Sequence, residues 1–592
     1  MVSANPINVR GGYFGVAVRC FAMLHQPVHS RNLVAIIVND FGYPGLTACW
    51  NFRKLANEWA ALGITVLRMD LPGTADSPAI YGNCVAQWQA GVSAAINFVR
   101  SHDQNVPIVL VGLRLGAMLA INAAANQKNI ASLQLIQPCL DGLAYVQQAE
   151  NVAPLVVQVQ YQGPEGRLLS GHFLTTEEFQ SLQSIQVDLA HPAGTMDVMS
   201  FPGDGAAGFV AAAQQAGWHA ELYQYDEKSE EWLIDAPLTR VPQCFGAMTQ
   251  RLQTLLSEPV KVTPWELDDR QSSHGYVEQS LRCQDTDGSV QFGILTAPDE
   301  DTVPETVVIL FGTASNRRTG IHDNNVYWAR SLAESGIACL RFDVTGLGDS
   351  EPRLGNSDND LLVPWNHTDA DAWLQLLRQM GVRRFGAAGL SSGGYNAFQC
   401  ALAHEDVVAL FGINVARYVI RQSIHEVIST QVKTSSSYVS ALVDPKTWLR
   451  LLKGEVAVKR IAAALSRRLM AALRTRIKML HVNRSNEAVL GEAHGNMLNI
   501  LKREGARVTL LYSVGDAYYF EFEQEFGPRG ESLTQEDNFK LVLLAGADHS
   551  LSHHRMARQI ADLLRDFFRE ALPETQVPDE AERRVVGGHG RL

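Results

Sequence analysis

Apolar and polar positions along this chain follow the pattern of short buried strands separated by amphipathic helices. An apolar run at 34–40 is followed by a helix-like stretch at 52–63, a second apolar run that ends in LRMD at 67–70, and a third at 107–112. Short strands alternating with helix-length segments are typical of a parallel sheet with helices on both faces. The pattern predicts an α/β fold.

The same order of elements returns in the second half of the chain, around a repeated motif. Residues 67–77 read LRMDLPGTADS and residues 340–350 read LRFDVTGLGDS, with six identical positions among eleven. The second motif is preceded by a strand pattern at 306–312 and a helix pattern at 326–336, and a further strand pattern follows at 383–389. A repeat in both sequence and context indicates two related domains in tandem.

This repeat suggests the domain boundaries. We expect a first domain at 1–258, a polar linker that contains proline at 259–275, and a second domain at 276–572. The second domain carries an insertion at about 417–500, which we interpret as a helical cap. The tail 573–592 is poor in apolar residues, and we expect it to be disordered.

The second domain contains a motif for a nucleophilic serine. Residues 389–393 read GLSSG, which is G-x-S-x-G, between a predicted strand and a predicted helix. Such a tight turn exposes the hydroxyl, here that of Ser391, above the sheet. Asp516 and His549 each follow a later apolar run, and the order Ser, Asp, His at strand ends is that of α/β-hydrolases.

We therefore predict a Ser391–His549–Asp516 triad, in which His549 takes the serine proton and Asp516 orients the imidazole. A helix N-cap is the alternative role for Asp516, and Asp548 is a weaker candidate for the acid because it is adjacent to His549. A surface loop is the alternative for His549.

Two backbone N–H groups are expected to form the oxyanion hole. One belongs to Ser392, directly after the nucleophile. The other follows the strand at 306–311, where the sequence leaves Gly312 and Thr313 as alternatives. We interpret Asp343, in the repeated motif, as a structural residue at the rim of the pocket.

The first domain keeps the turn but has no serine in it. Residues 112–116 read GLRLG, so Arg114 takes the nucleophile's place, and a guanidinium is not a nucleophile. No histidine follows His219 in the region that would match the second domain's histidine. We predict a non-catalytic domain in which Arg114 forms an internal or interdomain ion pair; binding of a carboxylate or phosphate is the alternative.

Composition and charge narrow the function classes. The 592 residues are 46% hydrophobic and 19% charged, and the formal net charge of −12 argues against a dedicated nucleic-acid binder. Eight cysteines without a CxxC pair argue against a disulfide scaffold and against structural zinc, and we expect no metal or other cofactor. The beginning of the chain lacks a signal-peptide pattern and no apolar run reaches 18 residues, so we expect a bacterial cytoplasmic enzyme without a transmembrane segment.

The predicted cap has a charge of its own. Its segment 444–478 contains ten Lys and Arg residues against two acidic ones, with leucine and isoleucine at helical spacing. A packed cap with a solvated basic face is one interpretation. The other is recognition of an acidic partner, such as an acyl carrier protein, a CoA tail or anionic lipid. The candidate binding residues are Arg467, Arg468, Arg474 and Arg476.

These motifs resemble a known pair of families. The first domain is similar to one type of exosortase-system-associated hydrolase-like protein, through GLRLGA at 112–117, the LPGTADS turn and QPCLDGLAYV. The second resembles the companion type, through RTGIHDNNVYWARSLAESGIACLRFDVTGLGDS, GLSSGG, LLYSVGD and GADH. The companion type often has cysteine where Ser391 stands here. The resemblance implies a bacterial α/β-hydrolase with a poorly defined substrate.

The sequence thus predicts a serine hydrolase that forms an acyl-enzyme on an ester or thioester. One alternative is an acyltransferase or cyclase that acts on carrier- or CoA-linked acyl chains. The other is a binding or scaffold protein with a hydrolase fold.

Overall fold

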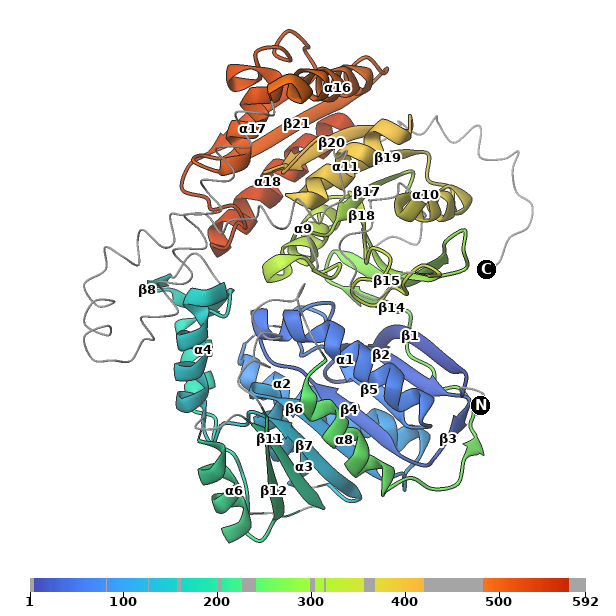
Figure 1. Ribbon diagram of the computed structural model, residues 1–592, viewed down its shortest axis with the longest axis vertical. Helices are drawn as coiled ribbons and strands as arrows, with labels where there is room; N and C mark the ends of the chain where they lie inside the picture. The colour runs from blue at the N-terminus through green and yellow to red at the C-terminus, as the bar shows by residue number, and fades with distance from the viewer. Residues whose placement is uncertain are drawn as a thin grey trace.

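The computed structural model contains two large sheets, one in each half of the chain (Figure 1). The structure describes residues 5–573, apart from 81, 126, 157–160, 191, 193, 201–204, 226–240, 299–303, 314–315, 356–367 and 420–482. In Figure 1 the first half, in blue to green, and the second half, in green to red, are stacked along the long axis.

The first sheet has eight strands in the order β1-β2-β5-β4-β6-β7-β11-β12. Strands β1 and β2 pair antiparallel, β2 pairs antiparallel with β5, and from β5 onward all neighbours are parallel. The strands are β1 (Ile7–Phe14), β2 (Cys20–Pro27), β4 (Val34–Val38), β5 (Thr65–Met69), β6 (Ile108–Leu113), β7 (Ile130–Ile136), β11 (Thr195–Ser200) and β12 (His219–Gln224).

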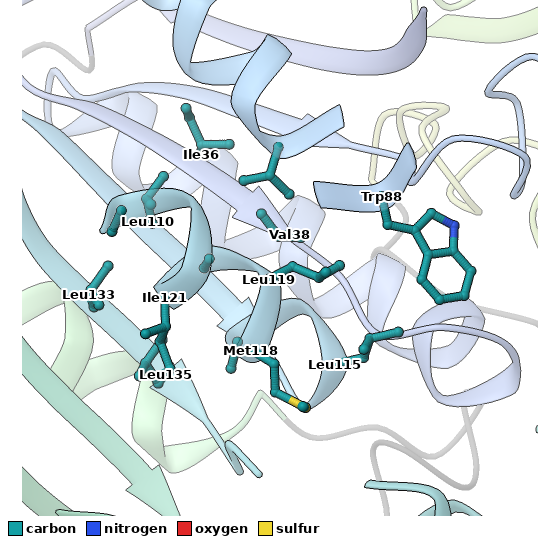
Figure 2. Packing of buried hydrophobic residues seen from close by; sticks show 14 of the residues in the cluster. Ile36, Val38, Trp88, Leu110, Leu115, Met118, Leu119, Ile121, Leu133 and Leu135 are labelled. Carbon is teal, nitrogen blue, oxygen red and sulfur yellow. The ribbon is translucent and has the colours of Figure 1, made fainter. Parts of the chain in front are cut away.

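Helices cover both faces of this sheet because both faces are apolar. Helices α1 (Tyr43–Ala61) and α8 (Gln243–Gln253) pack on one face. The other face is covered by α2 (Cys84–His102), α3 (Leu115–Ala124), α4 (Gly142–Val156), α5 (Thr176–Gln183) and α6 (Ala206–Gln215). Figure 2 shows this second core, with Leu115, Met118, Leu119 and Ile121 of α3 packed against leucine, isoleucine and valine side chains of β4, β6 and β7.

The second sheet has nine strands in the order β14-β15-β16-β18-β17-β19-β20-β21-β22. The first three pairings are antiparallel and the rest are parallel. The strands are β14 (Arg270–Ser273), β15 (Tyr276–Gln284), β16 (Val290–Ala297), β17 (Thr306–Phe311), β18 (Ala338–Phe342), β19 (Arg384–Leu390), β20 (Val407–Ile413), β21 (Arg507–Ser513) and β22 (Phe539–Leu544).

The helices of the second half are arranged like those of the first. One face carries α9 (Asn324–Ala333) and α18 (His554–Ala571). The other carries α10 (Thr368–Met380), α11 (Ser392–Ala403), α16 (Asn483–Leu501) and α17 (Ala517–Phe526). Without β14, the two strand orders match one for one, which confirms the predicted α/β fold with two related, mostly parallel sheets.

The segment 259–275 differs from the polar linker that we predicted. It contributes β13 (Val260–Lys261), which pairs with β3 (His29–Ser30) of the first half, and β14, which extends the second sheet. Between these strands, Asp268 and Tyr13 exchange two backbone hydrogen bonds, of 2.7 and 2.9 Å. Backbone pairing satisfies the polar groups of this segment, so its polar sequence does not make it a free tether.

The two halves meet through the repeated motif. Arg68 in β5 pairs with Asp349 of the second half, and Arg341 in β18 pairs with Asp76 of the first half at 2.6 Å. The two arginines occupy matching positions in the two motifs, and so do the two aspartates. The contact is therefore reciprocal, because each motif presents its arginine to the aspartate of the other.

Arg318 lies fully buried at the centre of this contact. It pairs with Asp76 at 2.6 Å, Asp343 at 2.5 Å and Asp349 at 2.8 Å, and its guanidinium lies 4.4 Å from the centre of the Phe292 ring. Burial by itself would raise the pKa of Asp76, but the surrounding guanidinium groups outweigh it and hold this pKa below its ordinary value. The charges of the interface compensate one another, as buried charges must.

Candidate active site

The turn that carries Ser391 joins β19 to α11 and has strained backbone geometry. Ser391 has φ 57° and ψ −116°, a region that residues other than glycine rarely adopt. Its N–H donates to the carbonyl of Ile413 at 2.8 Å, which holds the turn against β20. A Cβ at Gly389 would lie 2.3 Å from the backbone of Gly393, and one at Gly393 would lie 2.8 Å from the Gly312 carbonyl oxygen. The two glycines therefore allow the close approach that the motif predicts.

His549 lies within hydrogen-bonding distance of both other residues of the predicted triad. His549 Nε2 is 3.0 Å from Ser391 Oγ, and His549 Nδ1 is 2.8 Å from Asp516 Oδ2. A carboxylate only accepts hydrogen bonds, so Nδ1 carries the proton and Nε2 is free to accept from the serine hydroxyl. The exposed fraction is 29% for the His549 side chain and 3% for that of Asp516, so the carboxylate is buried while the imidazole is partly accessible.

Asp516 also has the alternative role that the sequence left open. It is the N-cap of α17, and its Oδ1 accepts from the N–H of Tyr518 at 2.8 Å. The other carboxylate oxygen faces His549. The cap therefore fixes the carboxylate in the orientation that the imidazole needs, and the two roles support each other.

Asp548, the weaker candidate for the acid of the triad, binds Ser552. Its two carboxylate oxygens accept from the N–H and the hydroxyl of Ser552, at 2.8 and 2.7 Å. This closes the loop between His549 and α18. The adjacent aspartate is thus a structural residue of the histidine loop.

Asn414 is a residue of the site that sequence reasoning missed. It follows β20 with φ 43°, is fully buried, and donates to the His549 carbonyl and to Ser513 Oγ, both at 3.0 Å. Its Oδ1 accepts from the Ser513 N–H at 2.7 Å. The amide thus joins the strand before Asp516 to the loop of His549. The only signal in the sequence was an asparagine near the end of an apolar run, and many turns share it.

The candidate oxyanion donors lie around the same turn. Ser392 begins α11, so its N–H is at a helix N-terminus. Thr313 Oγ1 donates to the Leu390 carbonyl at 2.8 Å, which connects the loop after β17 to the residue before Ser391. Gly312 also touches this turn, through the approach of its carbonyl to Gly393. Both alternatives for the second donor therefore remain next to Ser391.

The matching turn of the first half is filled by an internal ion pair. Arg114 has φ 50° and ψ −107°, nearly the geometry of Ser391, and its Nε lies 3.3 Å from Asp40 Oδ2. Asp40 Oδ1 accepts from Tyr145 at 3.0 Å and from the N–H of Leu115 at 3.4 Å. Leu115 follows this turn as Ser392 follows the turn of the second half, so the Asp40 carboxylate lies at the N-terminus of α3. Of the alternatives for Arg114, the structure shows the internal pair.

Two further groups of predicted residues lie elsewhere. Asp343 is buried in the interface between the halves, where it accepts from the Arg318 N–H at 2.5 Å, and so it is not a residue of the pocket rim. The basic segment 444–478, with Arg467, Arg468, Arg474 and Arg476, falls outside the described residues. Of the predicted cap at 417–500, the structure describes residues 417–419 and α16, although not the side chains of the first residues of that helix.

Three general features complete the description. Among the described residues, no three His, Cys, Asp or Glu side chains gather in a way that could hold a metal ion. The described helices include none with the length and apolar character needed to cross a bilayer. All eight cysteines are free thiols.

The chain was compared with family models, curated proteins and solved structures, and the similar solved structures include hydrolases. No family model matches the chain, and no curated protein matches it in sequence. A dienelactone hydrolase from Anabaena variabilis shares 13% identity over 50% of this chain and 98% of its own, with a TM-score of 0.28. A Pyrococcus furiosus esterase shares 13% sequence identity over 50% of this chain and 91% of its own, with a TM-score of 0.31. A serine hydrolase without a lid from Xanthomonas campestris shares 15% identity over 50% of this chain and 96% of its own, with a TM-score of 0.29.

Proposed function

We propose that this protein is a serine hydrolase that forms an acyl-enzyme at Ser391 on an ester or thioester substrate. The observation that carries the proposal is the continuous chain of contacts from Ser391 Oγ through His549 to Asp516, with distances of 3.0 and 2.8 Å. The strained turn presents the serine at the carboxyl end of β19, next to a helix N-terminus. Strand ends of a parallel sheet are where such folds bind their ligands.

The reaction follows from this geometry. His549 Nε2 takes the proton from Ser391 as the serine oxygen attacks the acyl carbon, and Asp516 stabilises the imidazolium that results. The Ser392 N–H and one from Gly312 or Thr313 stabilise the negative charge on the acyl oxygen. His549 then gives its proton to the leaving alkoxide or thiolate, and water, activated by the same histidine, releases the acid.

In this proposal residues 1–258 form a non-catalytic domain, and residues 276–572 form the catalytic one. The ion pair of Arg114 and Asp40 supports the first assignment, because it leaves no nucleophile at the first turn. We place the enzyme in a reducing compartment, the cytoplasm, and all eight cysteines being free thiols supports this.

Labelling with a fluorophosphonate tests the proposal directly. The wild type should be labelled at Ser391 and should hydrolyse a p-nitrophenyl ester or an acyl thioester. Ser391→Ala and His549→Ala should each lower kcat/KM by more than about a thousandfold, because the two act as a unit. Asp516→Asn should cost as much or less, through the wrong imidazole tautomer. His102→Ala, at an exposed position of α2, is the matched control.

The outcome also separates the alternatives. An unlabelled Ser391 in a folded protein would favour a binding or scaffold protein and would overturn the proposal. Acyl transfer that outruns hydrolysis when an alcohol or thiol acceptor is supplied would identify an acyltransferase that uses the same triad.

A further inference from the structure

A small three-stranded antiparallel unit of the first half, called the hairpin below, reaches the catalytic half close to the proposed base. Strands β8 (Gln162–Gly163), β9 (Gly166–Leu169) and β10 (His172–Thr175) form a small sheet separate from the large one. Figure 1 shows β8 between the upper end of α4 and the lower end of α18. Leu169 and Leu174 of β9 and β10 belong to the apolar core of the first half, so the hairpin connects that core to α18.

Aromatic and charged contacts fix the hairpin to the beginning of α18. Phe173 stacks on His554 with 4.0 Å between ring centres and 26° between ring planes. Glu165 pairs with Arg555 at 2.5 Å and also accepts from the Tyr161 hydroxyl at 2.7 Å. A stacked aromatic pair and a charge pair give this contact a defined geometry.

The contacted residues are only a few positions beyond His549. His553 is the N-cap of α18, and the loop before it is closed by Asp548, which accepts two hydrogen bonds from Ser552. Leu551, between them, is buried with φ 54°. A loop that is this short, packed and internally bonded transmits the position of the helix N-terminus to the imidazole.

The other end of the hairpin is held by the segment that follows the proposed oxyanion loop. His172 Nε2 lies 3.0 Å from Asp323 Oδ2, and the same oxygen accepts from the N–H of Ala75 at 2.9 Å. Asp323 ends the short helix η3 (Ile321–Asp323), a few residues after Arg317 and Arg318 of the interface. The hairpin is thus anchored at two points of the catalytic half.

We propose that the hairpin β8–β10 is a positioning element for His549, so that the non-catalytic half takes part in catalysis by holding the catalytic base in place. Glu165 and Phe173 act through α18 and do not touch the reacting atoms. This inference rests on the proposed function of Ser391 and His549. It gives the first half a role that the loss of its own nucleophile leaves open.

A set of surface variants tests this role. Phe173→Leu should lower kcat and the rate of fluorophosphonate labelling about three- to tenfold, the size expected for loss of one aromatic contact. Glu165→Gln should lower both about two- to fivefold, because its pair with Arg555 is exposed. KM should change little in either variant. Glu150→Gln is the matched control for Glu165→Gln. It removes an exposed Glu–Arg pair, with Arg167 of the same hairpin at 3.2 Å, that stays within the first half. Its kcat should equal that of the wild type.

Two further measurements separate positioning from general destabilisation. Glu165→Gln should have no further effect on labelling in a His549→Ala background, because the pathway through the imidazole is already lost. His554→Phe, which keeps an aromatic ring against Phe173, should retain wild-type kcat, whereas His554→Ala should behave like Phe173→Leu. Equal losses from Glu165→Gln with and without His549 would overturn the inference.

A readout that needs no activity keeps this test separate from that of the proposed function. Hydrogen exchange of residues 548–556 should be faster in Glu165→Gln and Phe173→Leu than in the wild type and in Glu150→Gln. Unchanged exchange in both variants would show that the hairpin does not hold the histidine loop. Faster exchange with an unlabelled Ser391 in the wild type would keep the structural clamp but reject its catalytic role together with the hydrolase proposal.

Discussion

Arg68 and Arg341 stand at the same place in the two repeated motifs, and each forms an ion pair with the aspartate near the end of the other motif. Both guanidinium groups are buried, and Arg341 is fully so. The motif that identifies the duplication in the sequence is thus also the surface that joins the two products of the duplication.

Asp76→Asn should destabilise the junction strongly. Asp76 is fully buried and pairs with Arg317, Arg318 and Arg341 at 2.9, 2.6 and 2.6 Å. Removal of its charge leaves buried guanidinium groups uncompensated, which costs about 3–5 kcal/mol. Urea unfolding should show a lower midpoint for this variant. Glu266→Gln, which removes an exposed pair with Arg10, should cost less than about 1 kcal/mol, and a similar shift for both variants would contradict the prediction.

Asn414→Ala should impair catalysis more than stability. Without the amide, the His549 carbonyl and Ser513 lose their common partner, so the histidine loop can move relative to the acid. A shift of about 1 Å costs up to about a hundredfold in rate, so kcat should fall about ten- to hundredfold with little change in KM. Gln137→Ala is the matched control, because Gln137 follows β7 of the first half with a similar φ of 51°. It shares the backbone strain but should keep full kcat.

Arg114→Ser should not create a second active site. The turn would then have a serine in the right backbone geometry, but the sequence has no histidine between His219 and His274 to activate it. In a Ser391→Ala background this variant should remain inactive and unlabelled. It should also lose about 3–5 kcal/mol of stability, because Asp40 is left buried without its cation. Combination with Asp40→Asn should restore part of that loss of stability. Esterase activity of the protein that carries both Ser391→Ala and Arg114→Ser would contradict the assignment of the first domain as non-catalytic.

Acid should weaken the junction through His25. This buried imidazole accepts a hydrogen bond from Arg68 Nε at 3.0 Å, and burial together with the Arg68 charge lowers its pKa from 6.5 to about 3. The unfolded chain therefore binds a proton that the folded one does not between about pH 6.5 and 3, so stability falls as pH falls, by up to about 1.4 kcal/mol per pH unit. His25→Gln should show a shallower fall in that window when urea midpoints are measured against pH. Identical slopes for the two proteins would contradict the prediction.

The elements that depend on local sequence could be predicted, and those that depend on distant contacts could not. The turn at Ser391 and its counterpart at Arg114 were recognisable because glycine spacing encodes them within five residues. Helix α1 begins at Tyr43, well before the helix predicted at 52–63, because Pro44 in its first turn is compatible with a helix start. The buried ion pair of Asp343 could not be predicted, because its partner Arg318 lies 25 positions earlier and belongs to no recognisable motif.

The reciprocal junction has a consequence for how such a chain can evolve. Two identical subunits related by a twofold axis would make the Arg68–Asp349 type of contact twice, and a change in either residue would alter both contacts at once. Joined in one chain, the two copies are encoded separately, so matching turns can differ, as they do with Arg114 in the first half and Ser391 in the second. The reciprocal ion pairs of the junction can then hold together two halves whose other residues differ.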